Sequence, residues 1–379
     1  MITVKAPLVY WNEPDVLKRS GEKVASLGQH ALIITGKAAL QVVRDDLLNA
    51  LEQAGVSYKI QLFQGQCTSS EIITFVQTAK QAKVDLIIGI DGGKTLDLSK
   101  AVAEKAGLPI VTVPTIAATC AAWSALTVLY DDNGRAAGYL PLLRSPDLVL
   151  ADTHILATAP RRYLAAGIGD TLVKWHEFAV NLSGNAQSLA LRSSVATAQL
   201  ALDILEEHAQ AVYEAAGTDT IPAYIIPAFQ DVLDSIIVLA GLVGSVQDGS
   251  VHAAIAHGLH DSLTQFPETH HSLHGEKVAF GLFVQWVLEG KSDSELHERA
   301  LQLHRLGLPV SLSDLGIQSE PEQIASRIAQ GLALREGAAD HLAFVVTPEP
   351  VATAIIRADA IGHTVRQYKH TSNEKVITS

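Results

Sequence analysis

The sequence is poor in cysteine, in positive charge and in long apolar runs, and each shortage excludes a class of protein. Its 379 residues include two cysteines, Cys67 and Cys120, without CxxC spacing, which is typical of a reduced, cytoplasmic protein. A formal net charge of -12 argues against nucleic acid or an anionic membrane as partner. The N-terminal MITVKAPLVYWNEPD lacks a basic stretch followed by an apolar one, so we expect no secretion signal. A small-molecule substrate fits these shortages best.

The longest apolar run extends from Ile236 to Val246, far short of the roughly 20 residues that a membrane-spanning helix needs. It follows Asp231 and Asp234, and we interpret it as a buried helix. A hydrophobic share of 48% indicates a globular chain rather than a disordered one. A chain of this length can bury a large core and divide into two domains.

Over the first 150 residues, short β-type runs alternate with helix-length segments, which is typical of a parallel sheet covered by helices. Strands are predicted at 31–35, 58–63, 84–90, 108–113 and 148–150. Residues 126–140 predict a β-hairpin around an Asp-Asp-Asn-Gly turn. After Pro160 the strand signals nearly vanish and helical patterns take over. We therefore predict an α/β domain over residues 1–160 and an all-α domain over residues 161–379.

The third predicted strand leads into Asp91-Gly92-Gly93-Lys94 and then into a helical pattern. A strand, a glycine turn and a helix N-terminus form an anion site, because unpaired backbone N–H groups face a phosphate and glycine lets it approach. A Gly-Gly pair alone is weak support, since many such turns hold glycine for its backbone freedom. Asp91 is either a helix N-cap or an acid that opposes phosphate.

Histidine is concentrated in one stretch, since six of the fifteen histidines lie within residues 251–280. His257 and His260 are three residues apart in an alanine-rich pattern, so on a helix they share a face. His271 and His274 repeat that spacing after a proline. Two such pairs could converge on one cation, because neutral imidazole is the commonest protein ligand of zinc and iron. A set of solvated or hydrogen-bonded histidines explains the stretch equally well.

A catalytic metal site usually adds a carboxylate to the imidazoles. Asp170 lies at the opening of a predicted helix in the second half, where a short acid is more often a cap than a ligand. The residues alone leave both roles open.

Five blocks of sequence carry a resemblance to a known family. They are GIDGGKTLDLSKA (89–101), VPTIAATCAAWSALTVLY (113–130), AAGIGDTLVKW (165–175), AIAHGLHDSLT (254–264) and ETHHSLHGEKVAFG (268–281). Their order and spacing resemble the iron-type, metal-dependent alcohol dehydrogenase superfamily, in its glycerol dehydrogenase-like branch, over nearly the whole chain. Within that branch, TIAATCAAW and GDTLVKW look most like the hydroxycarboxylate dehydrogenases, which reduce 2-oxo acids.

The resemblance implies that Asp170, His257 and His274 hold one divalent metal in the cleft between the two domains. Such a metal would stabilise an alkoxide while hydride passes between its carbon and a nicotinamide ring. Zinc and iron both stay open, and we expect zinc. His260 and His271 do not match ligand positions, so they are candidates for a proton relay, for support of the ligands or for a purely structural role.

For the nicotinamide cofactor, the resemblance points to the glycine loop and to the loop and hairpin that follow it. The implied residues are Gly92, Gly93, Lys94 and Asp97 in the first, and Thr115, Thr119, Ser124, Leu126 and Tyr130 in the second. Lys37 is a further candidate, because the residue after the second strand of such a domain selects between NAD and NADP. The segment Thr35-Gly36-Lys37 offers a cation and no acid. We expect NADPH to be accepted at least as well as NADH.

The chain departs from the family pattern at three positions. Asp91 stands where the first of three glycines is usual. Relatives of the glycerol type carry an aspartate where this chain has Cys120, and relatives with a fourth ligand carry a histidine where Lys174 stands. We therefore take Cys120 and Lys174 as candidate substrate-binding residues, and Lys174 also as a candidate catalytic residue. Lys174 would pair with the carboxylate of a 2-oxo acid or, one helical turn away, with Asp170.

The sequence thus predicts a cytoplasmic, homo-oligomeric oxidoreductase that transfers hydride between NAD(P)H and 2-oxo or 2-hydroxy carboxylates, with no nucleic-acid or membrane partner. A polyol dehydrogenase of the glycerol type is the nearest alternative. A dehydroquinate synthase-like lyase would share the two-domain plan but should need many basic residues for a phosphorylated substrate. The last alternative is a binding protein whose cofactor loop is disabled by Asp91, and binding of NADH or NADPH separates it from the enzymes.

Overall fold

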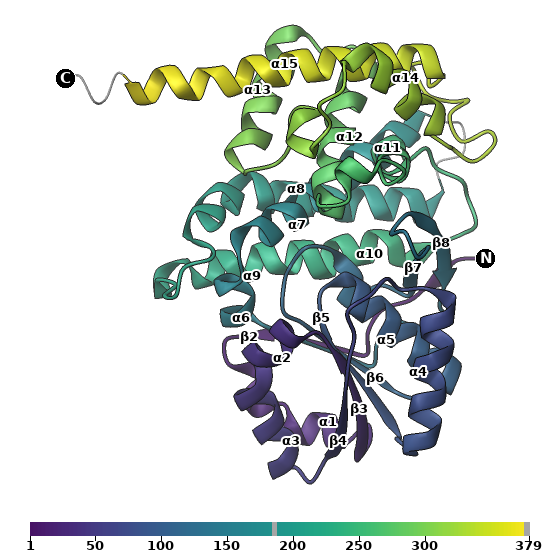
Figure 1. Ribbon diagram of the computed structural model, residues 1–379, viewed down its shortest axis with the longest axis vertical. Helices are drawn as coiled ribbons and strands as arrows, with labels where there is room; N and C mark the ends of the chain where they lie inside the picture. The colour runs from purple at the N-terminus through teal and green to yellow at the C-terminus, as the bar shows by residue number, and fades with distance from the viewer. Residues whose placement is uncertain (184–187, 375–379) are drawn as a thin grey trace.

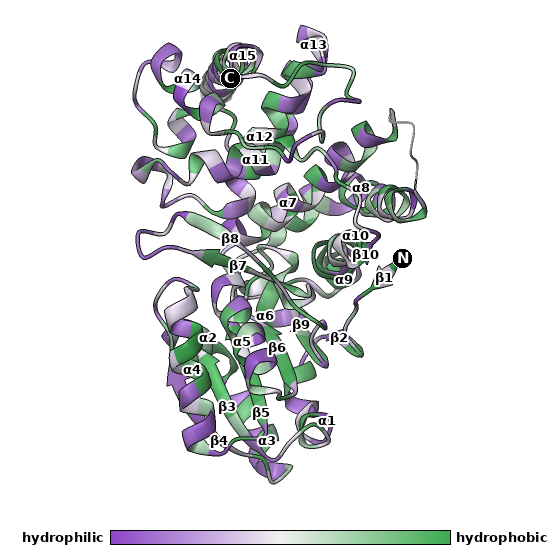
Figure 2. Ribbon diagram, turned by 90° about the vertical axis from the view of Figure 1, so that its right-hand side faces the viewer, coloured by the Kyte–Doolittle hydropathy of each residue, from purple (hydrophilic) through white to green (hydrophobic). Residues whose placement is uncertain are grey.

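The structure is a computed structural model that describes residues 1–183 and 188–374, with a sheet-containing half and a helical half stacked along the long axis (Figure 1). A parallel six-stranded sheet in the order β2-β9-β6-β5-β3-β4 forms the centre of the first half. Its strands are β2 (Val9–Glu13), β3 (His30–Thr35), β4 (Ser57–Leu62), β5 (Leu86–Asp91), β6 (Ile110–Pro114) and β9 (Leu148–Asp152). Figure 2 shows that the inner strands are strongly hydrophobic, as parallel strands covered on both faces must be.

Helices cover both faces of this sheet. They are α1 (Gly21–Ala25), α2 (Lys37–Val43), α3 (Asn49–Gln53), α4 (Ser69–Ala82), α5 (Gly93–Ala106) and α6 (Thr153–Thr158). Ile33 of β3 belongs to an apolar cluster with residues of α2 and α3, whereas its neighbours Leu32 and Ile34 pack with residues of α4 and α5. This alternation follows from the two-residue repeat of a strand and explains why residues 31–34 of β3 are all apolar.

The chain changes direction across the sheet between β3 and β5. Because β3 pairs with both β4 and β5, the chain leaves β3 toward one edge and returns on its other side. In such sheets ligands bind at this point, outside the carboxyl ends of the strands. Gly36 follows β3 there and Asp91 ends β5. A Cβ atom on Gly36 would lie 2.4 Å from Asp91 Oδ2, so the two loops touch and a larger residue would displace the Asp91 carboxylate.

The five predicted strands and the predicted hairpin are confirmed, the hairpin as β7 (Leu126–Tyr130) and β8 (Ala136–Pro141). Sequence analysis missed β2, which pairs with β9 at the sheet edge. It also missed β1 (Thr3–Val4), which pairs antiparallel with β10 (Val246–Gln247). The predicted all-α half therefore contains one two-residue strand.

The helical half packs around α12, whose residues are almost all buried and which contacts α7, α11, α13 and α15. Its helices are α7 (Arg161–Ala179), α8 (Leu189–Ala215), α9 (Ile226–Asp234), α10 (Ala240–Ser245), α11 (Ile255–Leu263), α12 (His274–Leu288), α13 (Asp293–Arg305), α14 (Pro321–Gly331) and α15 (Pro348–Glu374). The architecture is the predicted one, a parallel α/β half followed by a helical half. The exact division into residues 1–160 and 161–379 stays a prediction.

One helical segment, Ala223–Ser245, is long and apolar enough to cross a membrane by length and composition alone. It is longer than the run that the sequence suggested, because a π-helical turn at Ser235–Leu239 joins α9 to α10. The segment packs against α7 and α8, and Phe229 and Ile236 are completely buried. The core helix of a globular protein passes the same test, and this packing is that of a core helix.

Candidate metal and cofactor site

A cavity of about 1010 Å³ lies between the two halves and is lined by both. The first half contributes the loops after β3, β5 and β6 and the hairpin, and the second contributes α7, α11 and the start of α12. Most of the predicted site residues line this cavity, namely Lys37, Gly92, Gly93, Lys94, Asp97, Thr119, Cys120, Ser124, Leu126, Tyr130, Asp170, Lys174, His257, His260, His271 and His274. Thr115 is instead buried, and its N–H donates to the Asp91 carbonyl at 3.2 Å.

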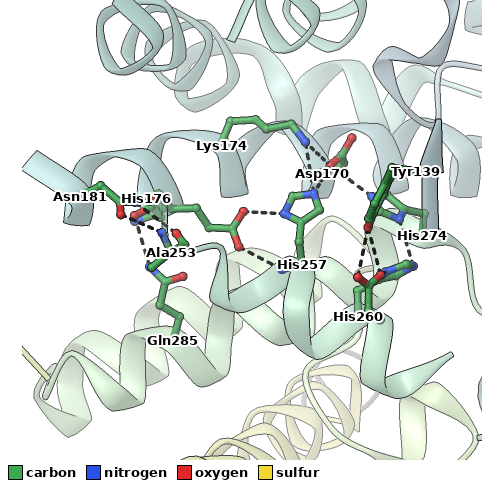
Figure 3. A network of polar contacts seen from close by, with 12 residues as sticks. Tyr139, Asp170, Lys174, His176, Asn181, Ala253, His257, His260, His274 and Gln285 are labelled. Carbon is green, nitrogen blue, oxygen red and sulfur yellow. Dashed lines mark hydrogen bonds and ion pairs between the residues drawn. The ribbon is translucent and has the colours of Figure 1, made fainter. Parts of the chain in front are cut away.

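Asp170, His257 and His274 meet in this cavity from three helices, α7, α11 and the first residue of α12 (Figure 3). One potential ligand atom of each lies within 4.8 Å of the others. Asp170 Oδ1 is 3.4 Å from His257 Nε2 and 3.6 Å from His274 Nε2. Two imidazoles and a carboxylate form the donor set of many catalytic zinc and iron sites. The three residues fit a divalent metal, although their role as ligands stays a prediction.

Asp170 is ionised, the form that binds a cation. Burial raises its pKa, but the charge of Lys174 and hydrogen bonds from His257 and His274 outweigh burial and hold the pKa well below its usual value. The Lys174 ammonium lies 2.7 Å from Asp170 Oδ1 and 3.3 Å from His257 Nε2. Of the two predicted partners for Lys174, the structure therefore shows the salt bridge with Asp170.

Glu177 is a site residue that sequence analysis missed. Its Oε1 accepts the backbone N–H of His257 at 3.0 Å, and its Oε2 lies 2.5 Å from His257 Nδ1, which leaves Nε2 facing Asp170. A carboxylate behind a ligand imidazole fixes its tautomer and orientation. Burial lowers the pKa of His257, but the Glu177 charge outweighs it and the pKa rises to about 9. The sequence signal that could have found Glu177 is spacing. Asp170, Lys174 and Glu177 follow an i, i+4, i+7 pattern, so on a helix they share a face.

His260 supports the imidazole of His274. The His260 Nε2 atom lies 3.0 Å from His274 Nδ1, and its Nδ1 lies 2.9 Å from Asp261 Oδ1. Tyr139 of β8 donates its hydroxyl to Asp261 Oδ2 at 3.1 Å, so a hydrogen-bonded chain joins the hairpin to His274 (Figure 3). Burial, and then repulsion from His274, lower the pKa of His260 to about 3. The neutral ring of His260 can support the candidate ligand His274. A role of His260 in a proton relay stays a prediction.

The prediction of a second helical histidine pair is wrong. The first helix, α11, does carry His257 and His260, but α12 begins only at His274. Glu276 accepts the N–H of Leu273 at 2.7 Å and so fixes the start of α12 there. His271 is exposed in the preceding turn, with its ring against Gly316. It lines the cavity, but the shared helix face that motivated its pairing does not exist.

The loop after β5 has the form of an anion site. Gly92 is the N-cap and Gly93 the first residue of α5. Asp91 is not the N-cap itself, but its Oδ1 accepts the Gly92 N–H at 2.8 Å and its Oδ2 accepts the Thr95 hydroxyl at 3.1 Å, so its carboxylate is bonded to the first turn of the helix. A Cβ atom on Gly92 would lie 2.6 Å from the end of the Ile116 side chain, so a larger residue would displace that side chain. The loop after β5, the N-terminal end of α5 and the cavity together fit a dinucleotide.

Asp97, a predicted cofactor residue, is bonded to other residues of the protein. It pairs with Lys100 Nζ at 2.9 Å and accepts the Val128 N–H at 3.0 Å, and both charged side chains are almost completely buried. The Lys100 ammonium also donates to the carbonyls of Ser124 and Leu126 at 2.9 and 2.6 Å. This buried pair ties the hairpin to α5, a role that the sequence did not predict.

Known proteins resemble the chain in both sequence and fold. The family described as iron-containing alcohol dehydrogenase matches residues 7–153. A glycerol dehydrogenase of Pseudomonas putida is 36% identical over 364 residues, which cover 95% of this chain and 97% of the relative. Hydroxycarboxylate dehydrogenase A of Escherichia coli is 36% identical over 335 residues, which cover 87% and 89%. The crystal structure of a probable glycerol dehydrogenase from Sinorhizobium meliloti has a TM-score of 0.83 at 29% identity, covering 95% and 99%.

Proposed function

Because the chain belongs to the glycerol dehydrogenase-like branch of the iron-containing alcohol dehydrogenases, we propose that it oxidises small polyols such as glycerol with NAD(P) and a divalent metal. The observation that carries the proposal is the meeting of Asp170, His257 and His274 in the cavity that also holds the glycine loop. The first choice of the sequence analysis, 2-oxo and 2-hydroxy carboxylates, is less well supported. The glycerol dehydrogenase relative matches 97% of its own length, against 89% for the hydroxycarboxylate relative.

When bound, a divalent metal supplies a Lewis acid for the alcohol oxygen, and a nicotinamide ring accepts the hydride. Asp170, His257 and His274 would hold that metal, while Glu177 and His260 keep the two imidazoles in position. The ring Nε2 of each imidazole faces the Asp170 carboxylate. The Lys174 ammonium lies 2.7 Å from Asp170 Oδ1 and 3.3 Å from His257 Nε2, so a metal would have to displace it from these two ligand atoms.

Hydroxycarboxylates are a second candidate, favoured by Lys174 and Cys120. Lys174 places an ammonium in the cavity wall beside Asp170, with 14% of its side chain exposed. A bound 2-oxo acid would need such a cation for its carboxylate, whereas a polyol needs none. Cys120 lines the same cavity and cannot hold a polyol hydroxyl as an aspartate would.

The deciding experiment is a substrate panel of glycerol, other vicinal diols, 2-hydroxy acids and 2-oxo acids with both cofactors, followed by the absorbance of reduced nicotinamide. A higher kcat/KM for glycerol than for any acid supports the proposal, and the reverse order transfers the assignment to the second candidate. Chelation should abolish turnover, and His274→Ala should do so without unfolding the protein. Full activity in metal-stripped enzyme would exclude the metal, and reloading with zinc or iron identifies the ion.

A further inference from the structure

Two lysines from opposite halves of the molecule face the cavity without an acidic partner. Lys94 is the second residue of α5, and Lys277 is the fourth residue of α12. Lys94 Nζ lies 5.4 Å from the centre of the Tyr130 ring, and Lys277 Nζ donates to the Ser272 carbonyl at 2.9 Å. Neither lysine forms an ion pair with the side chains that the structure describes, those of residues 1–183 and 188–366.

This arrangement of charge is unfavourable for the protein alone. Only 6% of Lys277 is exposed. Burial, and then repulsion from Lys94, lower the pKa of Lys277 to about 8, whereas Lys94 is exposed where it lines the cavity. The neighbouring acid Glu276 is engaged elsewhere, since Arg162 donates to its two oxygens at 2.6 and 2.8 Å. Two uncompensated cations that repel each other across one cavity indicate a ligand with more than one negative charge.

A second observation points to the same ligand. The hydroxyl of Ser272 is buried and lines the cavity, and it has no hydrogen-bond partner among the residues that the structure describes. A buried hydroxyl of this kind can donate to an oxyanion. The positive ends of α5 and α12, helices of 14 and 15 residues, also begin at the cavity. The wall thus offers two ammonium groups, a hydroxyl and two helix ends.

We propose that Lys277 and Lys94 together clamp the diphosphate of the nicotinamide dinucleotide between the two halves of the protein. The inference rests on the proposed function, because it requires a dinucleotide cofactor. A diphosphate bridge carries two negative charges, and in dinucleotide folds it lies at the glycine turn, where Lys94 stands. Lys277 then provides a contact between the cofactor and the helical half, because it lies on α12, the helix that also bears His274.

The test measures binding rather than turnover, by fluorescence titration of NADH and calorimetry of ADP-ribose. In Lys277→Met the affinity for both ligands should fall about tenfold to a hundredfold, the effect of losing one charge-assisted hydrogen bond. Adenosine, which lacks the diphosphate, should compete with NADH as well as it does in the wild type. Lys277→Arg should keep the affinity within about threefold, because it keeps the charge. Lys105→Met removes a lysine from the other end of α5 and serves as the matched control.

Unchanged ADP-ribose affinity in Lys277→Met would overturn the clamp. An equal loss of adenosine and ADP-ribose would also overturn it and assign Lys277 to the support of the Ser272 turn. Intact NADH binding with a raised KM for anionic substrates alone would move the lysine to substrate binding. The proposed function fails separately, since a wild-type protein that binds NADH but oxidises no alcohol leaves the clamp standing. A wild-type protein that binds no dinucleotide excludes the clamp as well.

Discussion

Glu177 holds His257 by two atoms, the backbone N–H at 3.0 Å and the ring Nδ1 at 2.5 Å. We predict that Glu177→Gln lowers metal affinity by about tenfold to a hundredfold, because the imidazole loses the partner that fixes its tautomer and raises its basicity. Competition with a chromophoric chelator measures this affinity. Glu206→Gln, an exposed change on α8, is the control. Equal affinities in the two variants would show that Glu177 does not act through the metal.

Asp91→Gly should change dinucleotide affinity only modestly and should lower stability by about 1 kcal/mol, the scale of a lost side-chain hydrogen bond. A carboxylate about 5 Å from a phosphate charge would repel it by roughly 3 kcal/mol at an effective dielectric near 20. Here the carboxylate is instead bonded to Gly92 and Thr95. NADH titration and urea unfolding measure the two effects, with Asp91→Asn as a control that keeps an acceptor. A gain of about two decades in affinity would show that the repulsion is real.

Lys37 is predicted to make NADPH at least as good a cofactor as NADH. It is the first residue of α2, separated from β3 by Gly36, and it lines the cavity where an acid would hold the ribose 2′-OH in an NAD-specific protein. Lys37→Ala should therefore raise the KM for NADPH and leave that for NADH unchanged. Initial rates with both cofactors test this prediction. A strong preference for NADH that Lys37→Ala does not alter would contradict it.

Lys174→Met separates the two substrate classes. If the ammonium receives a substrate carboxylate, the substitution lowers kcat/KM for 2-oxo acids by roughly 2 kcal/mol or more and spares glycerol and neutral ketones. The observed salt bridge with Asp170 offers the opposite outcome. An equal loss on charged and neutral substrates would place Lys174 in metal or proton chemistry rather than in recognition.

Acid should destabilise the protein through His176. Burial, and then repulsion from Arg299 and Lys291, lower its pKa from 6.5 to about 3 in the folded state. Between these values the unfolded chain binds a proton that the folded chain does not. Stability is therefore complete above about pH 6.5 and falls toward about pH 3, by at most about 1.4 kcal/mol per pH unit. His176→Gln can still accept the Trp286 N–H and should flatten this slope in urea unfolding, whereas parallel slopes would exclude His176 as the cause.

Four of the strands that sequence analysis found, β3, β5, β6 and β9, are almost entirely buried, whereas β4 at the sheet edge is partly exposed. Residues 31–34 of β3 and 86–88 of β5 are unbroken runs of aliphatic residues, a signal that needs no knowledge of partners. β2 reads VYWNE and is partly buried at every position, so it shows neither a run nor an alternation. Its partner β9 lies far along the chain, with Val9 opposite Leu148. Local pattern cannot reveal a strand that exists because of such a pairing.

The site shows a similar limit. Asp170 and His257 stand on different helices, so spacing could not bring them together, and family resemblance had to supply the ligand set. Glu177 was visible only as an acid seven residues after Asp170. The pairing of His271 with His274 assumed a helix that had already begun, whereas the hydrogen bond from Leu273 to Glu276 sets its start. Such a bond depends on side-chain geometry and cannot be read from the sequence.

The pairing of β1 with β10 ties the N-terminal end of the chain to the helical half. The chain then crosses to the sheet before β2 and crosses back between α6 and α7, so two separate strands of backbone join the halves. The cavity between the halves is therefore bordered by two backbone connections, and removing the first five residues would leave the segment between α6 and α7 as the backbone link between the sheet and the helical half.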